Sequence, residues 1–152
     1  FLISAHLPLY VVADGMGGHQ GGEVASAMAV ETIEANVAET TLDTVLGAVS
    51  EANARIFGRS AEDASLRGMG TTVVALALVA GVMGFDDGFV LMTSRASYEI
   101  VQKAAAVSIA VVAAVSAPTG MAVRVATDSG VTLVGFVRGE RHCVYSHPDR
   151  IH

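Results

Sequence analysis

Apolar and polar positions divide the first half of the chain into short apolar runs and longer amphipathic stretches. Residues 9–13 form an apolar run that predicts a buried strand, and residues 71–79 form a second run rich in β-branched side chains. A helix is expected from about Glu23, with an apolar face made of Ala25, Met28, Ala29, Ile33 and Val37. This half is therefore predicted to contain a strand, a turn, two helices and a strand.

The second of these helices has a better marked start than the first. Thr40 and Asp43 resemble a capping box, and the end of the helix is expected to fray within residues 58–68. One stripe along it is formed by Leu42, Val45, Leu46, Val49, Asn53 and Ile56.

In the second half, three apolar runs alternate with two helical patterns. The runs at Phe89–Met92, 109–115 and 131–137 predict strands. Ser94 is a candidate cap for a first helix, whose inward positions are Tyr98, Val101 and Ala105. Ser116 and Pro118 are expected to start a second helix, which has Gly130 at its end and Met121, Ala122 and Val125 inward. The pattern predicts a parallel strand-helix-strand-helix-strand unit with two right-handed crossovers.

The composition argues against some classes of protein but does not indicate a single class. The chain has 152 residues, 52% of them hydrophobic and 16% charged, with a net charge of −6. Nine scattered Lys and Arg residues argue against general nucleic-acid binding. Residues 104–123 are uncharged, but Pro118, Gly120 and hydroxyl side chains interrupt them, so no membrane span is expected. A single cysteine excludes an internal disulfide and favours a cytoplasmic location.

Candidate metal chemistry lies directly after the first strand. Five glycines fall among the eight residues 15–22, and Asp14 places a carboxylate before them. This combination suits Mg²⁺ or Mn²⁺ better than a phosphate, because Asp14 would repel an anion and no Gly-Lys-Ser/Thr ending is present. One carboxylate alone would bind the ion weakly. His19 in the same turn is interpreted as a solvated loop histidine, with a metal or phosphate contact as the alternative.

The sequence Val-Ala-Asp-Gly-Met-Gly-Gly-His at residues 12–19 and the Gly-Met-Gly-Thr-Thr-Val-Val strand at residues 68–74 resemble bacterial PPM-type, metal-dependent Ser/Thr protein phosphatases. The resemblance covers residues 1–81. It implies a metal role for Asp14 and the Gly15 carbonyl and a phosphoprotein substrate. The other metal carboxylates of that family have no counterpart here, so no catalytic residue is assigned.

A different resemblance begins after residue 81. The sequence Thr-Ser-Arg-Ala-Ser-Tyr-Glu-Ile-Val-Gln-Lys at residues 93–103, Ser-Ala-Pro-Thr at 116–119 and Leu-Val-Gly-Phe-Val-Arg-Gly at 133–139 resemble the C-terminal part of FdhD. That family supplies sulfur to the molybdenum cofactor of formate dehydrogenase, which becomes the expected partner. Its sulfur-carrying cysteines lie upstream of the matched region. Cys143 does not correspond to them.

The FdhD resemblance also implies a cofactor-binding segment. It places contacts to the guanine-dinucleotide form of the molybdenum cofactor at Phe136, Val137, Arg138, Gly139, Glu140 and Arg141. Guanidinium forks bind phosphate groups in a bidentate manner, although a charged hairpin turn explains the same residues. Ser94 and Arg95, between a strand and a helix, are a second place where an anion could bind.

The single cysteine stands near two histidines. Cys143 lies between His142 and His147 in a strand-like tail, an arrangement that invites a metal or nucleophile interpretation. Alternation along a strand separates the side chains of His142 and Cys143, so a packed thiol is expected instead.

Together these patterns predict an α/β protein made of two incomplete units, at residues 1–82 and 83–152. The main hypothesis is a fusion of a partial phosphatase with a partial FdhD-like sulfurtransferase accessory domain, lacking most catalytic residues of both. An FdhD-like cofactor-binding accessory protein and an active phosphatase are the alternatives. Exposed apolar edges in truncated units predict oligomers or aggregation.

Overall fold

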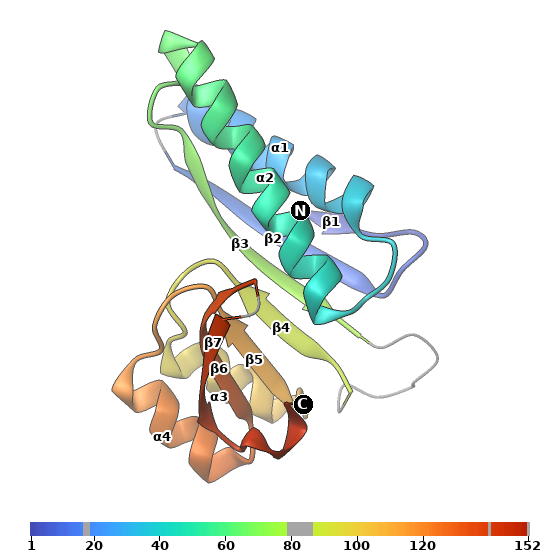
Figure 1. Ribbon diagram of the computed structural model, residues 1–152, viewed down its shortest axis with the longest axis vertical. Coiled ribbons are helices and arrows are strands. Elements are labelled where there is room, and N and C mark those ends of the chain that lie inside the picture. The colour runs from blue at the N-terminus through green and yellow to red at the C-terminus, as the bar shows by residue number, and fades with distance from the viewer. Residues whose placement is uncertain (17–18, 79–86, 140, 152) are drawn as a thin grey trace. The chain divides into compact units, whose positions relative to one another are not determined.

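The computed structural model describes residues 1–16, 19–78, 87–139 and 141–151 (Figure 1). For His19 and Gln20 it describes the backbone and not the side chains. The chain has an α/β fold and divides into two compact units, Phe1–Ala75 and Leu76–His152. The predicted junction at residues 80–85, with the boundary between residues 82 and 83, lies outside the described residues. Each unit is described by itself.

The first unit packs two helices on one face of a small sheet (Figure 1). Its strands follow the order β1-β2-β3, and β1 pairs with β2 in antiparallel fashion. The predicted apolar face of the first helix is confirmed, because Ala25, Ala29 and Ile33 are fully buried. The elements are β1 (Leu2–Ile3), β2 (Leu9–Met16), α1 (His19–Asn36), α2 (Leu42–Glu62), the 3-10 helix η1 (Ala64–Leu66) and β3 (Gly70–Ala77).

The predicted turn from Asp14 to residue 22 is wrong at both ends. β2 continues through Asp14 and Gly15 to Met16, and α1 starts at His19 instead of Glu23. The physical reason is close packing: a Cβ atom added to Gly15 would lie 2.0 Å from the carbonyl oxygen of Gly22. The glycines therefore let the backbones of a strand and a helix touch.

The start of α2 differs from the prediction by one residue. Thr41, and not Thr40, is the N-cap, because its hydroxyl accepts a hydrogen bond of 3.3 Å from the N–H of Thr44. The Thr44 hydroxyl in turn accepts from the N–H of Thr41, which completes a capping box. The helix ends at Glu62, within the region 58–68 where it was predicted to fray, and Asn53 is exposed instead of inward.

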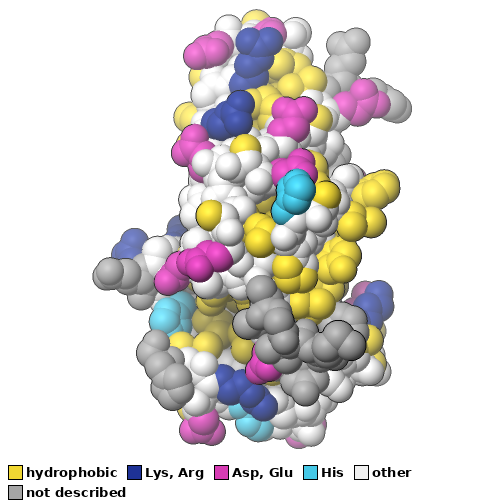
Figure 2. All heavy atoms as spheres, turned by 90° about the vertical axis from the view of Figure 1, so that its right-hand side faces the viewer, with side chains coloured by type: hydrophobic (Ala, Val, Ile, Leu, Met, Phe, Trp, Pro, Cys, Tyr) yellow, Lys and Arg dark blue, Asp and Glu magenta, His cyan; other side chains and the backbone are white. Residues whose placement is uncertain are grey.

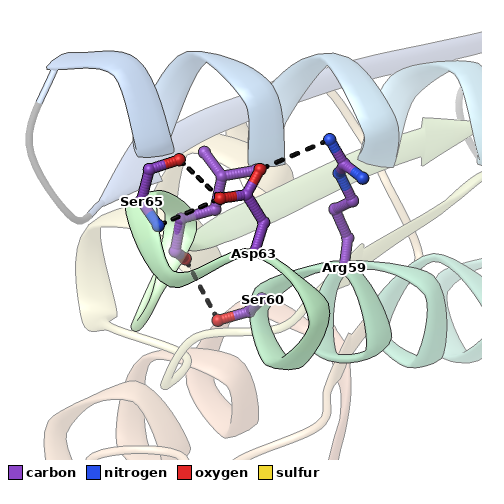
Figure 3. Close-up of polar contacts among 5 residues, drawn as sticks. Arg59, Ser60, Asp63 and Ser65 are labelled. Carbon is purple, nitrogen blue, oxygen red and sulfur yellow. Dashed lines mark hydrogen bonds and ion pairs between the residues drawn. The ribbon is translucent and has the colours of Figure 1, made fainter.

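Asp63 organises the connection from α2 to η1 (Figure 3). One of its carboxylate oxygens accepts hydrogen bonds from the hydroxyl and the N–H of Ser65, at 2.6 and 3.0 Å. The other oxygen lies 3.5 Å from a guanidinium nitrogen of Arg59. These contacts, the Ser65 hydroxyl first, lower the pKa of Asp63 below its usual value of 3.8.

Replacing Asp63 by asparagine is expected to lower the melting temperature at pH 7. A lowered folded-state pKa means that the ionised carboxylate stabilises the fold above about pH 3.8, and that this stabilisation is lost as the pH falls through the folded-state pKa. The difference from the parent protein should therefore shrink in acid, as measured by circular dichroism melts across that range. Glu51→Gln, which removes an exposed carboxylate from α2, is the control and should show a smaller pH-dependent difference.

The second unit confirms the predicted strand-helix-strand-helix-strand order. β4 pairs with β5 and β5 with β6, both in parallel, while β6 pairs with β7 in antiparallel fashion. Helices α3 and α4 pack against each other, and Gly130 ends α4 with the expected left-handed φ of 73°. The elements are β4 (Phe89–Met92), α3 (Tyr98–Ala106), β5 (Val111–Ala114), α4 (Gly120–Ser129), β6 (Thr132–Arg138), β7 (Arg141–Ser146) and the 3-10 helix η2 (Pro148–Arg150).

Both helices of this unit start later than predicted. The N-cap of α3 is Ser97 and not Ser94, and α4 follows Thr119, whose hydroxyl accepts a 3.1 Å hydrogen bond from the N–H of Ala122. Residues 93–97 and 115–119 instead form loops. The predicted inward faces are correspondingly wrong in part, since Tyr98 is 41% exposed and Met121 is 51% exposed.

The uncharged stretch of residues 104–123 contains the end of α3, all of β5 and the start of α4. Among the described residues, every helix is too short or too polar to cross a bilayer.

Candidate functional site

The carboxyl ends of the parallel strands β4, β5 and β6 meet at one edge of the second unit. The N–H of Val115 donates to the carbonyl of Met92 at 2.9 Å, and the N–H of Thr119 donates to the carbonyl of Ala96 at 3.0 Å. These hydrogen bonds tie the loop after β5 to the end of β4 and to the loop that follows it. Open α/β sheets bind ligands at this edge, so its side chains are the candidate site.

β6 is distorted where it reaches this edge. A Cβ atom on Gly135 would lie 2.8 Å from the Pro118 ring and 2.9 Å from the Tyr145 ring, so only glycine fits there without displacement. The next residue, Phe136, has a left-handed φ of 57° and a side chain that is 45% exposed. Left-handed backbone in a bulky residue is strained, and such strain is concentrated at functional sites. The N–H of Phe136 donates to the carbonyl of Ser116 at 3.3 Å, which anchors the distortion.

Two arginines face each other across the hairpin that joins β6 to β7. Arg138 and Arg141 are direct cross-strand partners, a geometry that puts both side chains on the same face of the sheet. Both are exposed, and Gly139 between them has a left-handed φ of 56°. In the part of the chain that the structure describes, neither arginine forms an ion pair. Two like charges held opposite each other are unfavourable until an anion lies between them.

The predicted cofactor-binding segment therefore does not present all its side chains equally. Phe136, Arg138, Gly139 and Arg141 are exposed at the edge, whereas the side chain of Val137 is 3% exposed and belongs to the core. Glu140, the remaining residue of the prediction, lies outside the described residues.

Ser94 and Arg95, the second predicted anion position, follow β4 at the same edge of the sheet, but they do not begin a helix. Ser94 does not cap α3, and it lies with Arg95 in the exposed loop after β4. Ser116 and Pro118, predicted to start a helix, lie against β6: the Ser116 carbonyl accepts from the N–H of Phe136, and the Pro118 ring lies 2.8 Å from a Cβ atom placed on Gly135. No pattern in the sequence indicates this contact.

The candidate metal residues belong to no cluster of metal-ligating side chains among the residues that the structure describes. Asp14 and Gly15 lie in β2, with Asp14 exposed. Across the described residues, no group of three or more His, Cys, Asp or Glu side chains is arranged to hold a metal ion. His142, Cys143 and His147, all described, likewise form no such group. Manganese or magnesium binding at Asp14 gains no support from this arrangement.

The prediction of a packed thiol is wrong, because Cys143 is exposed. It lies on β7, the outer strand of its unit, where residues 141–143 all reach solvent. His147, by contrast, places its Nε2 atom 2.9 Å from the carbonyl oxygen of Thr127 at the end of α4. His147 therefore has a structural contact with the end of α4.

Fold and edge together define an α/β protein with a paired-arginine hairpin suited to a phosphate-bearing ligand. Residues 72–152 match the profile of the FdhD/NarQ family, and this match covers more than half of the chain. The chain belongs to the FdhD/NarQ family.

Individual relatives match the same part of the chain. The sulfur carrier protein FdhD of Cupriavidus necator is 53% identical over 78 residues, which are 51% of this chain and 27% of that protein. FdhD of Bordetella petrii is 56% identical over 65 residues, 43% of this chain and 23% of that protein. FdhD of Sulfolobus acidocaldarius is 48% identical over 67 residues, 44% of this chain and 26% of that protein. The chain thus spans 23–27% of the length of these relatives.

One solved structure is also similar, a protein described as a formate dehydrogenase accessory protein from Desulfotalea psychrophila. The two sequences are 31% identical over a match that covers 44% of this chain and 30% of the other chain, and the TM-score is 0.43. The phosphatase resemblance of residues 1–81 gains no support from these comparisons. The resemblance to FdhD is therefore better supported than the resemblance to the phosphatases.

Proposed function

We propose that residues 72–152 bind the guanine-dinucleotide form of the molybdenum cofactor at the carboxyl edge of β4, β5 and β6. The chain would act there as an FdhD-like accessory protein of formate dehydrogenase. Membership of the FdhD/NarQ family supports this class of ligand, and the curated relatives are sulfur carrier proteins. The observation that carries the proposal is the cross-strand pair of Arg138 and Arg141.

The residues at the edge fit the chemistry of this ligand. A diphosphate linkage would bring negative charge between two guanidinium groups and relieve their mutual repulsion, and each guanidinium could donate two parallel hydrogen bonds to a phosphate. The exposed ring of Phe136 offers an apolar surface for a planar base beside them. When bound, the cofactor supplies the molybdenum centre that receives sulfur, and the protein contributes binding and orientation.

We do not assign the sulfur-carrying step to Cys143. This is the one cysteine of the chain, and sulfur-carrying cysteines of the family lie upstream of the matched region by resemblance. The described residues therefore support cofactor binding, and the transfer of sulfur would require groups that they do not contain.

Guanosine diphosphate carries the base and the diphosphate of the proposed ligand and is the probe of choice. Isothermal titration calorimetry should detect saturable binding with a dissociation constant below about 1 mM. Adenosine diphosphate should bind more weakly, because it retains the phosphates but not the guanine. Failure of guanosine diphosphate to bind at millimolar concentration would remove the proposed function.

A further inference from the structure

The pairing of β6 with β7 contains two irregularities, and the first lies on β7. Leu133 pairs with Ser146 and Val134 pairs with Val144, so Tyr145 is an extra residue without a direct partner on β6. An extra residue of this kind is a β-bulge, which bends its strand and redirects a side chain, and bulges are common next to functional sites.

The second bulge lies on β6, at the edge that carries the proposed ligand site. Between Gly135 and Arg138, β6 has two residues, whereas one residue of β7 separates their partners. The first of the two is Phe136, with its left-handed φ of 57°. This bulge cancels the offset that Tyr145 introduces, because each strand then has one extra residue. The two bulges therefore belong to one arrangement of the hairpin.

The ring of Tyr145 packs over the glycine that precedes Phe136. A Cβ atom added to Gly135 would lie 2.9 Å from Cε2 of Tyr145 and 2.8 Å from Cδ of Pro118. The two rings fill the space that a side chain at position 135 would need, one from β7 and the other from the loop after β5. An aromatic ring that covers a glycine of the neighbouring strand pins the register of a sheet. The rings thus restrict the main chain just before Phe136.

Phe136 needs such support, because its backbone conformation is unfavourable for a residue with a side chain. Glycine adopts a left-handed φ freely, whereas phenylalanine keeps it only where the surrounding structure holds it. The hydrogen bond of 3.3 Å from the N–H of Phe136 to the carbonyl of Ser116 is long and gives part of this support. The Phe136 ring is 45% exposed, so core packing does not fix it. The contact of Tyr145 with Gly135 restrains the backbone from the other strand.

We propose that Tyr145 is a positioning residue of the ligand site, whose ring keeps Phe136 in the left-handed conformation that presents the phenylalanine ring to a bound base. This inference rests on the proposed function and adds to it a residue on which recognition of the base depends. Without the Tyr145 ring, the main chain at Phe136 relaxes toward extended backbone and the Phe136 ring turns away from the ligand.

The arginine pair alone does not distinguish one diphosphate from another. Arg138 and Arg141 are suited to phosphate groups, which guanosine diphosphate shares with inorganic pyrophosphate. On the face of the protein drawn in Figure 2, the described Lys and Arg side chains are scattered among acidic and hydrophobic ones and form no broad basic surface. Recognition of the base therefore depends on Phe136 and on the residues that hold it.

Titration calorimetry of the full chain with two probes tests the proposal. Inorganic pyrophosphate reports on the arginines, and guanosine diphosphate reports on the arginines and the base together. Tyr145→Ala should weaken binding of guanosine diphosphate about fivefold or more, as expected when a base loses its aromatic partner, and should leave the affinity for pyrophosphate unchanged. Tyr145→Phe should keep the parental affinities, because the contact is made by a ring carbon. Tyr10→Ala is the matched control, since Tyr10 in the first unit is 42% exposed against 38% for Tyr145, and it should change neither affinity.

A double-mutant cycle shows whether Tyr145 acts through Phe136. Phe136→Ala should weaken binding of guanosine diphosphate about as much as Tyr145→Ala does, and the double variant should bind no more weakly than either single variant. Losses that add up in the double variant would mean that the two residues contribute separately, and would overturn the inference. Parental affinity of Tyr145→Ala for guanosine diphosphate, or an equal loss of affinity for pyrophosphate, would overturn it as well.

A measurement without ligand separates this inference from the proposed function. The carbon chemical shifts of the Phe136 Cα and Cβ atoms in nuclear magnetic resonance spectra report its backbone conformation. The left-handed conformation should be present in the parent protein and in Tyr145→Phe, and should be lost in Tyr145→Ala. Its persistence in Tyr145→Ala would overturn the inference and leave the proposed function standing. A parent protein with a left-handed Phe136 that does not bind guanosine diphosphate would remove the proposed function, and the role of Tyr145 in binding with it.

Discussion

Gly15→Ala is expected to unfold the first unit or to destabilise it by more than about 3 kcal/mol. The added methyl group would lie 2.0 Å from the carbonyl oxygen of Gly22, and both contacting segments are backbone that cannot rotate away. The cost therefore comes from separating α1 from β2, which would open the core around Ala25 and Ala29. Chemical denaturation followed by circular dichroism measures the change.

Gly47→Ala is the matched control for this substitution. Gly47 lies inside α2 with open space around its Cα atom, so alanine introduces no contact and raises helix propensity. It should stabilise the protein by about 0.5–1 kcal/mol. If Gly15→Ala were as well tolerated as Gly47→Ala, the close packing of β2 and α1 would be wrong.

Arg138→Ala and Arg141→Ala are each expected to weaken guanosine diphosphate binding about tenfold or more. Each removes hydrogen bonds between a guanidinium and a phosphate, and hydrogen bonds to charged groups contribute about 1.5–3 kcal/mol. The double variant should lose measurable binding. Because either single change also relieves the repulsion between the two arginines, the free protein should be as stable as the parent or more so.

Arg124→Ala provides the control for net charge. Arg124 is exposed on α4, and removing it changes the total charge by the same amount. Titration calorimetry should give an affinity within about twofold of the parent protein, with a weaker salt dependence as the only effect. Equal losses for Arg124→Ala and Arg138→Ala would mean that binding follows overall charge and not the hairpin.

The order of elements in the second unit was predictable because each strand is a compact apolar run. Phe89–Met92 is buried on both faces and was predicted with its correct ends. The helix starts were not predictable in the same way. Ser94 and Ser97 are both acceptable caps from sequence, and the structure uses Ser97, which follows Ala96, whose carbonyl accepts a hydrogen bond from the N–H of Thr119.

The candidate site was located through resemblance, and its geometry needed the structure. Pairing of Arg138 with Arg141 depends on a shift of register between Gly135 and Arg138, which no periodicity in the sequence encodes. The exposure of Cys143 is a similar case. Alternation predicts which neighbours share a face of a strand, but it does not predict whether that strand lies at an edge.

For the glycines of residues 15–22, the sequence predicted a ligand site where the structure shows close packing of a strand and a helix. Their density favoured a ligand turn, because glycine is the residue that turns and ligand loops require. Glycine is equally the residue that lets a helix approach a strand, and Gly15 with Gly22 uses it in that way. A sequence pattern alone does not separate these two uses, since both need the missing Cβ atom.

β7 is the outermost strand of its unit, and an outer strand offers unpaired main-chain groups to any extended chain nearby. Arg141 and His142 place polar side chains on this strand, and the irregular pairing with β6 interrupts its regular geometry. Charged side chains and bulges are the devices by which natural sheets resist uncontrolled growth into fibrils. Arg141 thus protects the chain from strand-by-strand aggregation at the position where it is proposed to hold a phosphate.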